Sequence, residues 1–516
     1  MTKRRVRFAP SPTGPLHMGG VRTALYNYLY AHQVGGTFIL RIEDTDSTRF
    51  VPGAEEYVIE SLRWCGIIPD EGIDENGHVV ETPSAKHPHA PYRQSQRRGI
   101  YREYAERLVN SGNAYYAFDT ADELAALRTA AEAGKRTFTY NYATRMQLRN
   151  SLTLPAEEVE RLLKEDSNWT IRFKMPENRI VEMDDMIRGH IEVNTNTLDD
   201  KVLWKKADEL PTYHLANIVD DHLMEITDVI RGEEWLPSLP LHYLLYEALG
   251  WSDVKPNFAH LSLLLKPDGK GKLSKRDGDR LGFPVFPLQW TSPEGEVTRG
   301  YREDGYYPEA FVNLLAMLGW NPGTEEELFD LEGLTKAFSL DRVVKSGARF
   351  NFDKAKWFNQ EYLRKRTTEQ LIADFRALNG DKVKGFDDAY VGAVLEMMKE
   401  RAHFANELWE LTGFFFEAPQ QYDEASVNKF WKDEIKEIIP KVQEFVKGID
   451  PFGKDTIENA LHELITTNEW PMGKVMNTLR LFLVGVSKGP GIADMMAILG
   501  KEEVNSRINN AISKLG

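Results

Sequence analysis

A glycine-rich segment near the N-terminus has residue types that suit phosphate binding. Residues 11–20, SPTGPLHMGG, place His17 with Gly14, Gly19 and Gly20 between a strand-like run and a helix-like run. Such a loop presents backbone N–H groups and a helix N-terminus to phosphate oxygens, and His17 could donate a further hydrogen bond. The patterns GxxxxGK[ST] and GxGxxG are absent here. Taken alone, the segment therefore also fits an ordinary turn with a surface histidine.

A second segment, KGKLSKRDG at residues 270–278, is strongly basic. It places Lys270, Lys272, Lys275 and Arg276 in a short loop flanked by glycines. Such a loop can close over a polyphosphate and neutralise charge that develops during group transfer. A solvated basic loop without a catalytic role is the alternative, and the segment alone does not separate the two.

The first segment lies inside a β–loop–α–β pattern. Residues 4–8, RRVRF, predict a short strand, and the three prolines of residues 9–17 exclude a helix interior. Apolar residues then recur at helical spacing over 21–34, and TFILRIED at 37–44 predicts a second strand. This order is typical of a Rossmann-type, nucleotide-binding α/β fold.

The rest of the chain divides into further regions. Helices are predicted over 54–67 and 98–112, mixed short strands follow, and ITDVIRG at 226–232 predicts a return to the core fold. From about residue 350 the pattern is almost wholly helical, although Pro440 must kink one helix or begin another. We expect a Rossmann core in two halves (1–95 and 211–260), an inserted α+β region (96–210), a region with the basic loop (261–350) and an all-α region (351–516).

Composition narrows the class of protein. The 516 residues suffice for three or four domains, and 42 % hydrophobic with 28 % charged residues is ordinary for a globular protein. The single cysteine, Cys65, excludes a disulfide framework and a Cys-rich zinc site, and we interpret it as a small buried apolar residue. No signal sequence or membrane-length apolar run is apparent, so we expect a cytoplasmic protein without a membrane partner. The net charge of −15 means that an RNA partner would be held by local basic patches.

The two segments together resemble a known pair of motifs. HxGG at 17–20, followed about 250 residues later by KLSKR, is similar to the HIGH and KMSKS motifs of class I aminoacyl-tRNA synthetases. RFAPSPTGPLHMGGVRTALYNYLYA, FILRIEDTD, PYRQSQR and PTYHLANIVDDHLMEITDVIRGEEW look like the glutamyl/glutaminyl branch. The matches are scattered from about residue 5 to 360. The helical end favours the glutamyl-tRNA synthetases, because glutaminyl relatives more often end in β-barrels.

This resemblance implies a ligase that acts in protein synthesis. Such a ligase forms glutamyl-adenylate and pyrophosphate from ATP and glutamate, then transfers glutamate to the 3′-terminal adenosine of tRNA-Glu. The implied fold is a Rossmann-type catalytic core with an inserted α+β acceptor-end-binding domain at 96–210, a stem-contact region at 261–350 and an all-α anticodon-binding region at 351–516. The resemblance further implies Mg²⁺ with the ATP, no zinc, and a monomer.

The resemblance also implies roles for the residues of the two motifs. The catalytic residues would be His17 and Lys275, with Lys275 stabilising the α-phosphate as pyrophosphate leaves, by electrostatics and without a covalent enzyme intermediate. The residues expected to contact ATP are His17, Gly19, Gly20, Lys272, Ser274 and Lys275.

A glutamate pocket must hold one ammonium group and two carboxylates. By the resemblance, Glu43 pairs with the α-ammonium, and Arg231 with Arg7 suits the side-chain carboxylate, because guanidinium forks bind carboxylates bidentately. An amide facing these arginines would leave charge unpaired, which disfavours glutamine. The residues expected to bind glutamate are Arg7, Ala9, Ser11, Glu43, Tyr213, Asn217 and Arg231.

Two further segments have alternative interpretations. In VDDH, Asp220, Asp221 and His222 could be metal ligands, but three adjacent side chains rarely converge on one ion, so we favour structural or supporting roles and no metal. The aromatic segment 280–308 is longer than the resemblance suggests, and it could be a lid on the basic loop or an Ω-loop.

Two rival functions remain at this stage. A related nucleotidyltransferase without tRNA would lack the RIEDTD and PTYHLANIVDDH motifs. A catalytically inactive RNA-binding paralogue is expected to have lost His17, Lys275 or Arg231, and all three are present. The sequence does not decide whether tRNA-Gln is charged as well as tRNA-Glu.

Overall fold

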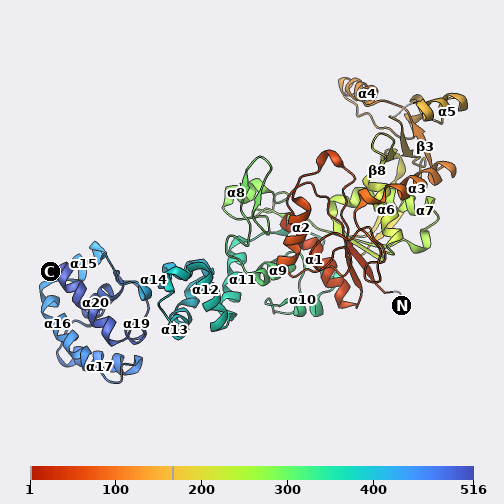
Figure 1. Ribbon diagram of the computed structural model, residues 1–516. Helices are drawn as coiled ribbons and strands as arrows, with labels where there is room; N and C mark the ends of the chain where they lie inside the picture. The colour runs from red at the N-terminus through yellow and green to blue at the C-terminus, as the bar shows by residue number, and fades with distance from the viewer. Residues whose placement is uncertain (1–2, 166–167) are drawn as a thin grey trace. The chain divides into compact units, whose positions relative to one another are not determined.

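The chain forms an α/β unit followed by a helical one. The computed structural model describes residues 3–165 and 168–516, and contacts divide the chain into Met1–Ala355 and Lys356–Gly516. The first unit combines strands with helices, whereas the described residues of the second contain helices and no strand (Figure 1). This order confirms the expected fold class of an α/β core with an all-α C-terminal region.

The N-terminal β–α–β pattern is present as predicted, with shifted bounds. Strands β1 (Arg5–Phe8) and β2 (Thr37–Leu40) pair in parallel, and α1 (Met18–Gln33) connects them. Helix α1 begins three residues before the predicted start, because His17 caps its first turn. Strand β2 ends earlier than predicted, since beyond Leu40 the chain pairs with a loop through Ile42 instead.

The central sheet brings distant parts of the first unit together. Strand β10 (Asn257–Leu261) lies between β9 (Asp228–Gly232) and β5 (Ile180–Asp185), parallel to both, and β6 (Gly189–Asn194) pairs antiparallel with β5. Strand β1 lies beside β9, where the backbone N–H of Thr227 donates to the carbonyl of Arg5. The remaining elements around this sheet are α2 (Ala54–Trp64), α3 (Arg98–Asn110), α6 (Tyr213–Leu223), α7 (Leu239–Ala248), α9 (Pro308–Met317), α10 (Leu331–Ala337), β11 (Leu264–Leu265) and β14 (Ala348–Arg349).

Segment 96–210, expected as one inserted region, contributes to two sheets. Strands β3 (Ala114–Ala117), β4 (Thr170–Phe173), β7 (Val202–Lys205) and β8 (Leu210–Pro211) form a separate antiparallel sheet. Helices α4 (Ala121–Ala133) and α5 (Ala156–Glu165) lie at the outer end of that sheet (Figure 1). Strands β5 and β6 join the central sheet instead, because Val181, Met183 and Asp185 are buried at alternate positions of β5.

Segment 280–308 contains a short hairpin. After α8 (Lys275–Leu281), strands β12 (Trp290–Thr291) and β13 (Val297–Thr298) pair antiparallel. The segment is fixed to α2, because the Tyr57 hydroxyl donates to the carbonyl of Leu288 at 2.6 Å and the Trp290 ring packs edge-on against Tyr57.

The second unit is a succession of amphipathic helices. Helix α16 (Asp433–Lys447) runs through Pro440 without a break, so no new helix begins there. Ile435, Ile439 and Val442 are fully buried in it, whereas Phe445 of the same apolar pattern is 38 % exposed. The other helices that end the chain are α11 (Phe352–Lys365), α12 (Thr368–Val383), α13 (Asp388–Met398), α14 (Leu408–Phe416), α15 (Glu424–Phe430), α17 (Lys454–Thr467), α18 (Met472–Val484), α19 (Ile492–Leu499) and α20 (Lys501–Leu515).

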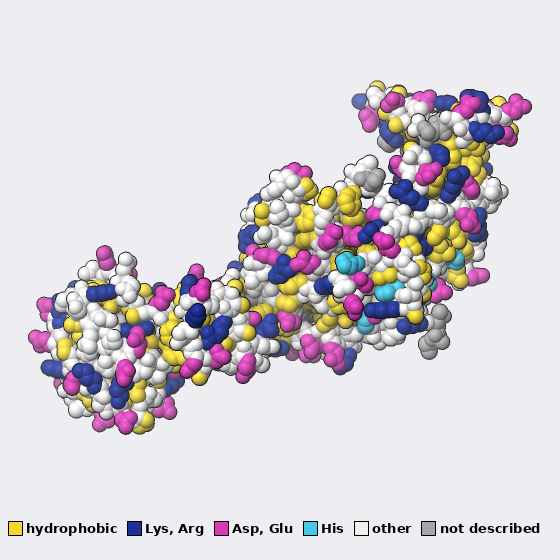
Figure 2. Space-filling view, in the orientation of Figure 1, with side chains coloured by type: hydrophobic (Ala, Val, Ile, Leu, Met, Phe, Trp, Pro, Cys, Tyr) yellow, Lys and Arg dark blue, Asp and Glu magenta, His cyan; other side chains and the backbone are white. Residues whose placement is uncertain are grey.

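The surface mixes charges of both signs. On the face shown in Figure 2, Lys and Arg side chains alternate with Asp and Glu over both units. In the described part of the chain, no helix combines the length and apolarity that a membrane span needs.

Candidate active site

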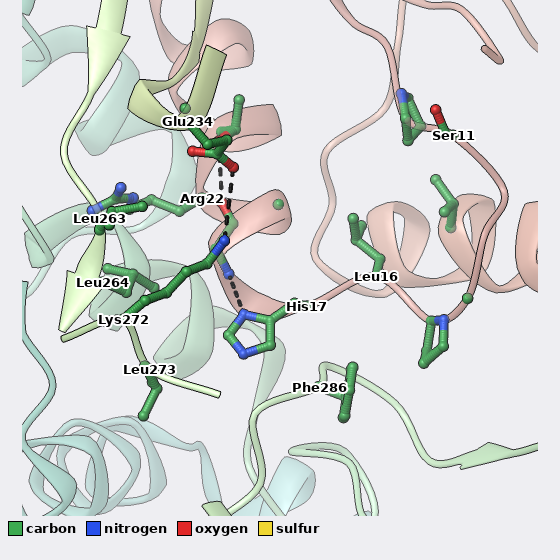
Figure 3. A pocket seen from close by; sticks show the side chains of 18 of the residues that line it. Ser11, Leu16, His17, Arg22, Glu234, Leu263, Leu264, Lys272, Leu273 and Phe286 are labelled. Atoms are coloured by element: carbon green, nitrogen blue, oxygen red, sulfur yellow. Dashed lines mark hydrogen bonds and ion pairs between the residues drawn. The ribbon is translucent and has the colours of Figure 1, made fainter. Parts of the chain in front are cut away.

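A cavity of about 410 Å³ opens where strands of the central sheet end (Figure 3). Its walls come from the loop 10–17 after β1, the first turns of α1, Gly232 at the end of β9, residues 262–264 after β10, and Lys272 with Leu273. Open α/β sheets bind ligands at the carboxyl ends of their strands. The cavity therefore lies where such a fold binds a nucleotide, and it brings both sequence motifs to one place.

His17 presents a neutral hydrogen-bond donor to this cavity. Its Nδ1 accepts the backbone N–H of Gly19 at 3.2 Å, which caps helix α1 and leaves the proton on Nε2. Burial, together with the nearby Lys272, lowers the pKa of His17 to about 4, so the ring is uncharged at neutral pH. Nε2 is buried and has no partner among the described residues. This N–H group is available to an acceptor such as a phosphate oxygen.

The three glycines of the first motif have different reasons to be glycine. A Cβ at Gly20 would lie 2.5 Å from the Leu16 side chain, so Gly20 is required by packing within the protein. A Cβ at Gly19 would meet no atom closer than 3.6 Å, and Gly14 has φ of +145°. Gly19 is therefore the glycine that leaves space on the cavity side at the start of α1.

The basic loop places only one of its motif lysines in the cavity. Lys272 lines the wall, with its Nζ 3.9 Å from the Glu234 carboxylate (Figure 3). Ser274 instead caps α8 through Asp277. Lys275, the first residue of α8, directs its Nζ to Glu296 of the β12–β13 hairpin at 3.0 Å. The aromatic segment therefore contacts the second motif lysine directly, and it also contributes Phe286 to the cavity wall.

Arg231 is a buried guanidinium without a carboxylate partner. It lies on β9 and is 5 % exposed. Its Nη1 donates to the Tyr213 hydroxyl at 2.9 Å and to Nδ1 of His242 at 3.3 Å, and its Nε donates to Nε2 of His260 at 2.9 Å. Among the described residues, Arg231 forms no ion pair with an Asp or Glu carboxylate; the nearby carboxylates of Asp221 and Asp185 pair with Arg7 and His260 instead. A buried cation that has only neutral partners is suited to an anionic ligand.

Arg7, the second arginine expected in the pocket, is already paired. Its Nε and Nη2 donate to the two carboxylate oxygens of Asp221 at 2.9 and 3.1 Å. Arg41 donates to the same carboxylate at 2.8 Å. Although burial by itself raises the pKa of Asp221, Arg7 and Arg41 hold it below the ordinary value. The fork of Arg7 is therefore satisfied inside the protein, and its Nη1 remains for a ligand.

Glu43 belongs to the same buried network. Its carboxylate accepts from Arg41 at 2.9 Å and from the Asn217 side chain at 3.2 Å. Burial raises the pKa of Glu43, although Arg41 and Arg7 act in the opposite direction. Of the other expected pocket residues, Ser11 lines the cavity and is exposed, and Ala9 is half-buried in the same loop.

The three residues of the VDDH segment point to different places. The Asp220 carboxylate accepts from Gln94, Arg97 and Tyr101 at 2.7 to 2.9 Å, whereas Asp221 holds Arg7 and Arg41. The His222 ring stacks on Trp251 with centroids 3.7 Å apart. These contacts agree with structural roles for this segment.

Several residues of this site escaped the sequence interpretation. Arg41, Asp185, His242 and His260 are buried and hydrogen-bonded around the expected pocket. Asp185 could have been recognised from the sequence. It occupies a position of β5 at which the alternating pattern predicts a buried apolar side chain, so a charged residue there is unexpected.

Comparison with known proteins identifies the relatives of this site. Residues 3–357 match the family model for the catalytic domain of class I tRNA synthetases (E and Q), and residues 361–512 match an anticodon binding domain. The chain is 53 % identical to a glutamate–tRNA ligase of Porphyromonas gingivalis over 99 % of both chains, and 53 % identical to one of Christiangramia forsetii over 100 % of this chain and 99 % of the relative.

A solved structure agrees with these sequence matches. The crystal structure of a glutamate tRNA ligase from Elizabethkingia meningosepticum, in complex with its amino acid, covers 100 % of both chains with a TM-score of 0.94 at 52 % identity. A family model over most of the chain and full-length relatives above half identity leave one conclusion. The chain belongs to the glutamate–tRNA ligase family of class I tRNA synthetases.

Proposed function

We propose that the chain charges tRNA-Glu with glutamate at the expense of ATP. In the first step, an oxygen of the glutamate α-carboxylate forms a bond to the α-phosphorus of ATP, and the bond to pyrophosphate breaks. In the second step, a hydroxyl of the 3′-terminal adenosine of tRNA forms an ester with the glutamyl carbonyl carbon. AMP leaves, and the hydroxyl proton leaves with it.

The observation that carries the proposal is the unpaired guanidinium of Arg231. Its hydrogen-bond partners are all uncharged: the side chains of Tyr213, His242 and His260 and the backbone carbonyl of Trp235. A substrate carboxylate would gain charge-assisted hydrogen bonds there. The amide of glutamine would leave the buried positive charge uncompensated, which costs about 1–3 kcal/mol or more. A site of this kind therefore favours glutamate over glutamine.

Roles for the remaining pocket residues follow from charge. Glu43 is the carboxylate available to the α-ammonium group, with Asn217 holding its orientation. Arg7, through its remaining nitrogen, and Tyr213 would contact the carboxylates, and Ala9 and Ser11 would form the wall between glutamate and ATP. Arg7, Tyr213, Asn217 and Arg231 lie on strands or on helix α6, and Glu43 is buried. This part of the pocket is therefore formed before the ligand arrives.

The cavity beside His17 suits ATP. His17 offers a neutral N–H to a phosphate oxygen, Gly19 leaves space for the nucleotide beside the backbone of α1, Gly20 lines the same wall, and Lys272 supplies positive charge. Lys275 would stabilise the α-phosphate once it exchanges Glu296 for the nucleotide, with Ser274 fixing the start of α8. Mg²⁺ is held mainly by phosphates and water in such sites. This fits a cavity whose described lining contains one carboxylate, Glu234.

Larger parts of the chain would serve the tRNA. We propose that the sheet β3–β4–β7–β8, within segment 96–210, binds the acceptor end, that residues 261–350 contact the stem, and that the helices after residue 350 bind the anticodon. We further propose a monomer that acts in the cytoplasm, where tRNA is charged.

The direct test is charging of purified tRNA-Glu and tRNA-Gln, each with labelled glutamate and, separately, labelled glutamine. We expect glutamate on tRNA-Glu and no charging with glutamine. Glutamate on both tRNAs would define an enzyme that does not discriminate between them. Failure to charge either tRNA, with active control enzymes, would refute the proposal.

Pyrophosphate exchange separates the two steps. The assay measures incorporation of labelled pyrophosphate into ATP with glutamate present, with and without tRNA-Glu. Exchange that appears only with tRNA would show that tRNA completes the activation site. Exchange without tRNA would show that the pocket and the ATP cavity suffice for activation.

A further inference from the structure

Arg231 is held from behind by a chain of buried hydrogen bonds. Its Nε donates to Nε2 of His260 at 2.9 Å, and Nδ1 of His260 lies 2.6 Å from Oδ2 of Asp185. Arg231 is 5 % exposed, His260 is fully buried and Asp185 is 4 % exposed. The hydrogen bonds between these three side chains therefore lie in the protein interior.

The three residues come from three adjacent strands. His260 of β10 is in register with Arg231 of β9, and Phe258 of β10 is in register with Asp185 of β5. On β5 the side chains alternate, so Asp185 faces inward while its neighbour Asp184 faces solvent. A carboxylate at an inward position of a strand carries a desolvation cost unless it has a specific partner.

Only one arrangement of protons satisfies this chain. Oδ1 of Asp185 accepts the backbone N–H groups of Ile187 and Arg188 at 2.9 and 2.8 Å, which leaves Oδ2 to face the imidazole. Burial by itself raises the pKa of Asp185, but His260 and these N–H groups keep it below its ordinary value, so the carboxylate is ionised. Oδ2 must then accept from Nδ1–H of His260. The lone pair of Nε2 is left for the N–H of Arg231.

The opposite side of Arg231 also ends in a neutral histidine. His242 accepts from Arg231 through Nδ1, and its Nε2 lies 3.4 Å from Nδ1 of His214. Burial, followed by the charge of Arg231, lowers the pKa of His242 well below its ordinary value. The guanidinium is therefore oriented on two sides without losing its charge to a carboxylate, in contrast to Arg7, which is paired with Asp221.

We propose that Asp185 and His260 are positioning residues that fix Arg231 for a substrate side-chain carboxylate, and so help to set the preference for glutamate over glutamine. The His260 imidazole lies between the Asp185 carboxylate and the Arg231 guanidinium and hydrogen-bonds to both. The carboxylate thereby orients the guanidinium without forming an ion pair with it. This inference rests on the proposed function, since it assigns a specificity role within the same pocket.

Asp185→Asn is the informative substitution. The backbone N–H groups would keep the amide oxygen, so the amide N–H₂ would face Nδ1 of His260. The imidazole would then carry its proton on Nε2, opposite the N–H of Arg231. We expect kcat/KM for glutamate in tRNA charging to fall by roughly 10- to 100-fold, by analogy with the loss seen when the hydrogen-bond partner of a metal-ligating histidine is removed. The ratio of glutamate to glutamine use should fall as well, while the KM for ATP stays within about two-fold.

Matched variants separate positioning from general damage. Asp184→Asn removes the adjacent, exposed carboxylate of the same strand and should behave as the unmodified chain. His260→Gln keeps a neutral acceptor for Arg231, whereas His260→Leu removes it, so the glutamine variant should retain more glutamate activity. Glutamate kinetics of Asp185→Asn equal to those of Asp184→Asn would overturn the proposal.

A spectroscopic measurement decides the proposal if a buried variant does not fold. Imidazole ¹⁵N shifts of the unmodified protein, with the His260 signal assigned from His260→Gln or His260→Leu, report which nitrogen carries the proton. Should neither His260 variant fold, ¹⁵N–¹⁵N coupling across the Arg231–His260 hydrogen bond assigns the same signal. Protonated Nδ1 with unprotonated Nε2 supports the inference, and protonated Nε2 overturns it. Neither result depends on activity, so a chain that failed to charge glutamate would refute the proposed function separately.

Discussion

The two sides of the candidate site are built from different kinds of structure. The carboxylate pocket, which we define as Arg7, Glu43, Tyr213, Asn217 and Arg231, rests on strands, on helix α6 and on the segment directly after β2. The basic segment, residues 270–278, is a loop only up to Ser274 and continues as the first turn of α8. Lys270 and Lys272 are exposed, and Lys275 is partly exposed. Pocket side chains are tied by buried hydrogen bonds, whereas Lys272 and Lys275 make ion pairs in which both partners stay partly exposed.

Under the proposed function, one site would divide recognition from catalysis. A charge that must discriminate a carboxylate from an amide gains most where water is excluded and its position is fixed. Charges that follow a departing pyrophosphate must be able to move, and an exposed ion pair worth about 0–1 kcal/mol is easily exchanged.

The largest effect on stability should come from Asp221→Asn. The substitution removes a carboxylate shared by Arg7 and Arg41 and leaves two buried guanidinium groups short of charge. We expect the free energy of unfolding to fall by about 3–5 kcal/mol, measured by urea denaturation. Asp184→Asn, at the surface, is the control. A stability loss no larger than that of the control would mean that the network is not held together by its charges.

Arg231→Cys should separate binding from stability. Charging with glutamate should drop at least about ten-fold in kcat/KM, since the charge that meets the substrate carboxylate is lost. The free energy of unfolding should fall less than it does for Asp221→Asn, because the hydrogen-bond partners of Arg231 are uncharged. Steady-state charging and urea denaturation check the two parts. Unchanged glutamate kinetics would remove Arg231 from the pocket.

His17 should make the folded chain sensitive to acid. Its folded-state pKa of about 4 lies below the ordinary 6.5, so the unfolded chain takes up this proton first as pH falls. The contribution of neutral His17 to the free energy of unfolding is complete above pH 6.5. It is lost progressively as the pH falls from 6.5 to 4, and about 2 kcal/mol is already lost at pH 5.

The comparison that measures this effect is His17→Gln. Unfolding free energies of the variant and the unmodified chain, each taken at pH 7 and pH 5, should show a smaller acid loss for the variant by about 2 kcal/mol. Equal losses would mean that the imidazole is solvated in the folded chain. This part of the cavity would then be exposed to water, as the basic loop is.

The smallest effect is expected from Glu296→Gln. Glu296 forms an ion pair with Lys275, and the Glu296 side chain is 71 % exposed. Because exposed ion pairs contribute little, the loss of this one should change the KM for ATP by less than about five-fold. Glu294→Gln, an exposed neighbour in the same hairpin, is the control. A larger change, specific to Glu296, would show that the hairpin sets the position of Lys275 and that the loop is less adjustable than its exposure indicates.

Sequence patterns were sufficient to predict the fold class, the two motifs and the residue types of the pocket. Helical periodicity located α1 and the C-terminal helices, because local periodicity follows directly from which face is buried. HxGG and KLSKR, read with RIEDTD, were enough to indicate the reaction. Boundaries moved where a local contact overrode the pattern, as when His17 capped α1.

Which of the buried charges lack an ion-pair partner could not be predicted from sequence patterns. Arg7 and Arg231 read alike in the sequence, yet Arg7 meets Asp221 across 214 positions of chain and Arg231 meets only uncharged partners. The pairing of Lys275 with Glu296 and of His260 with Asp185 is likewise set by strand register and by the path of the hairpin. Periodicity reports which face of an element is buried. It does not report which buried charge lies opposite, because that depends on elements that meet only after folding.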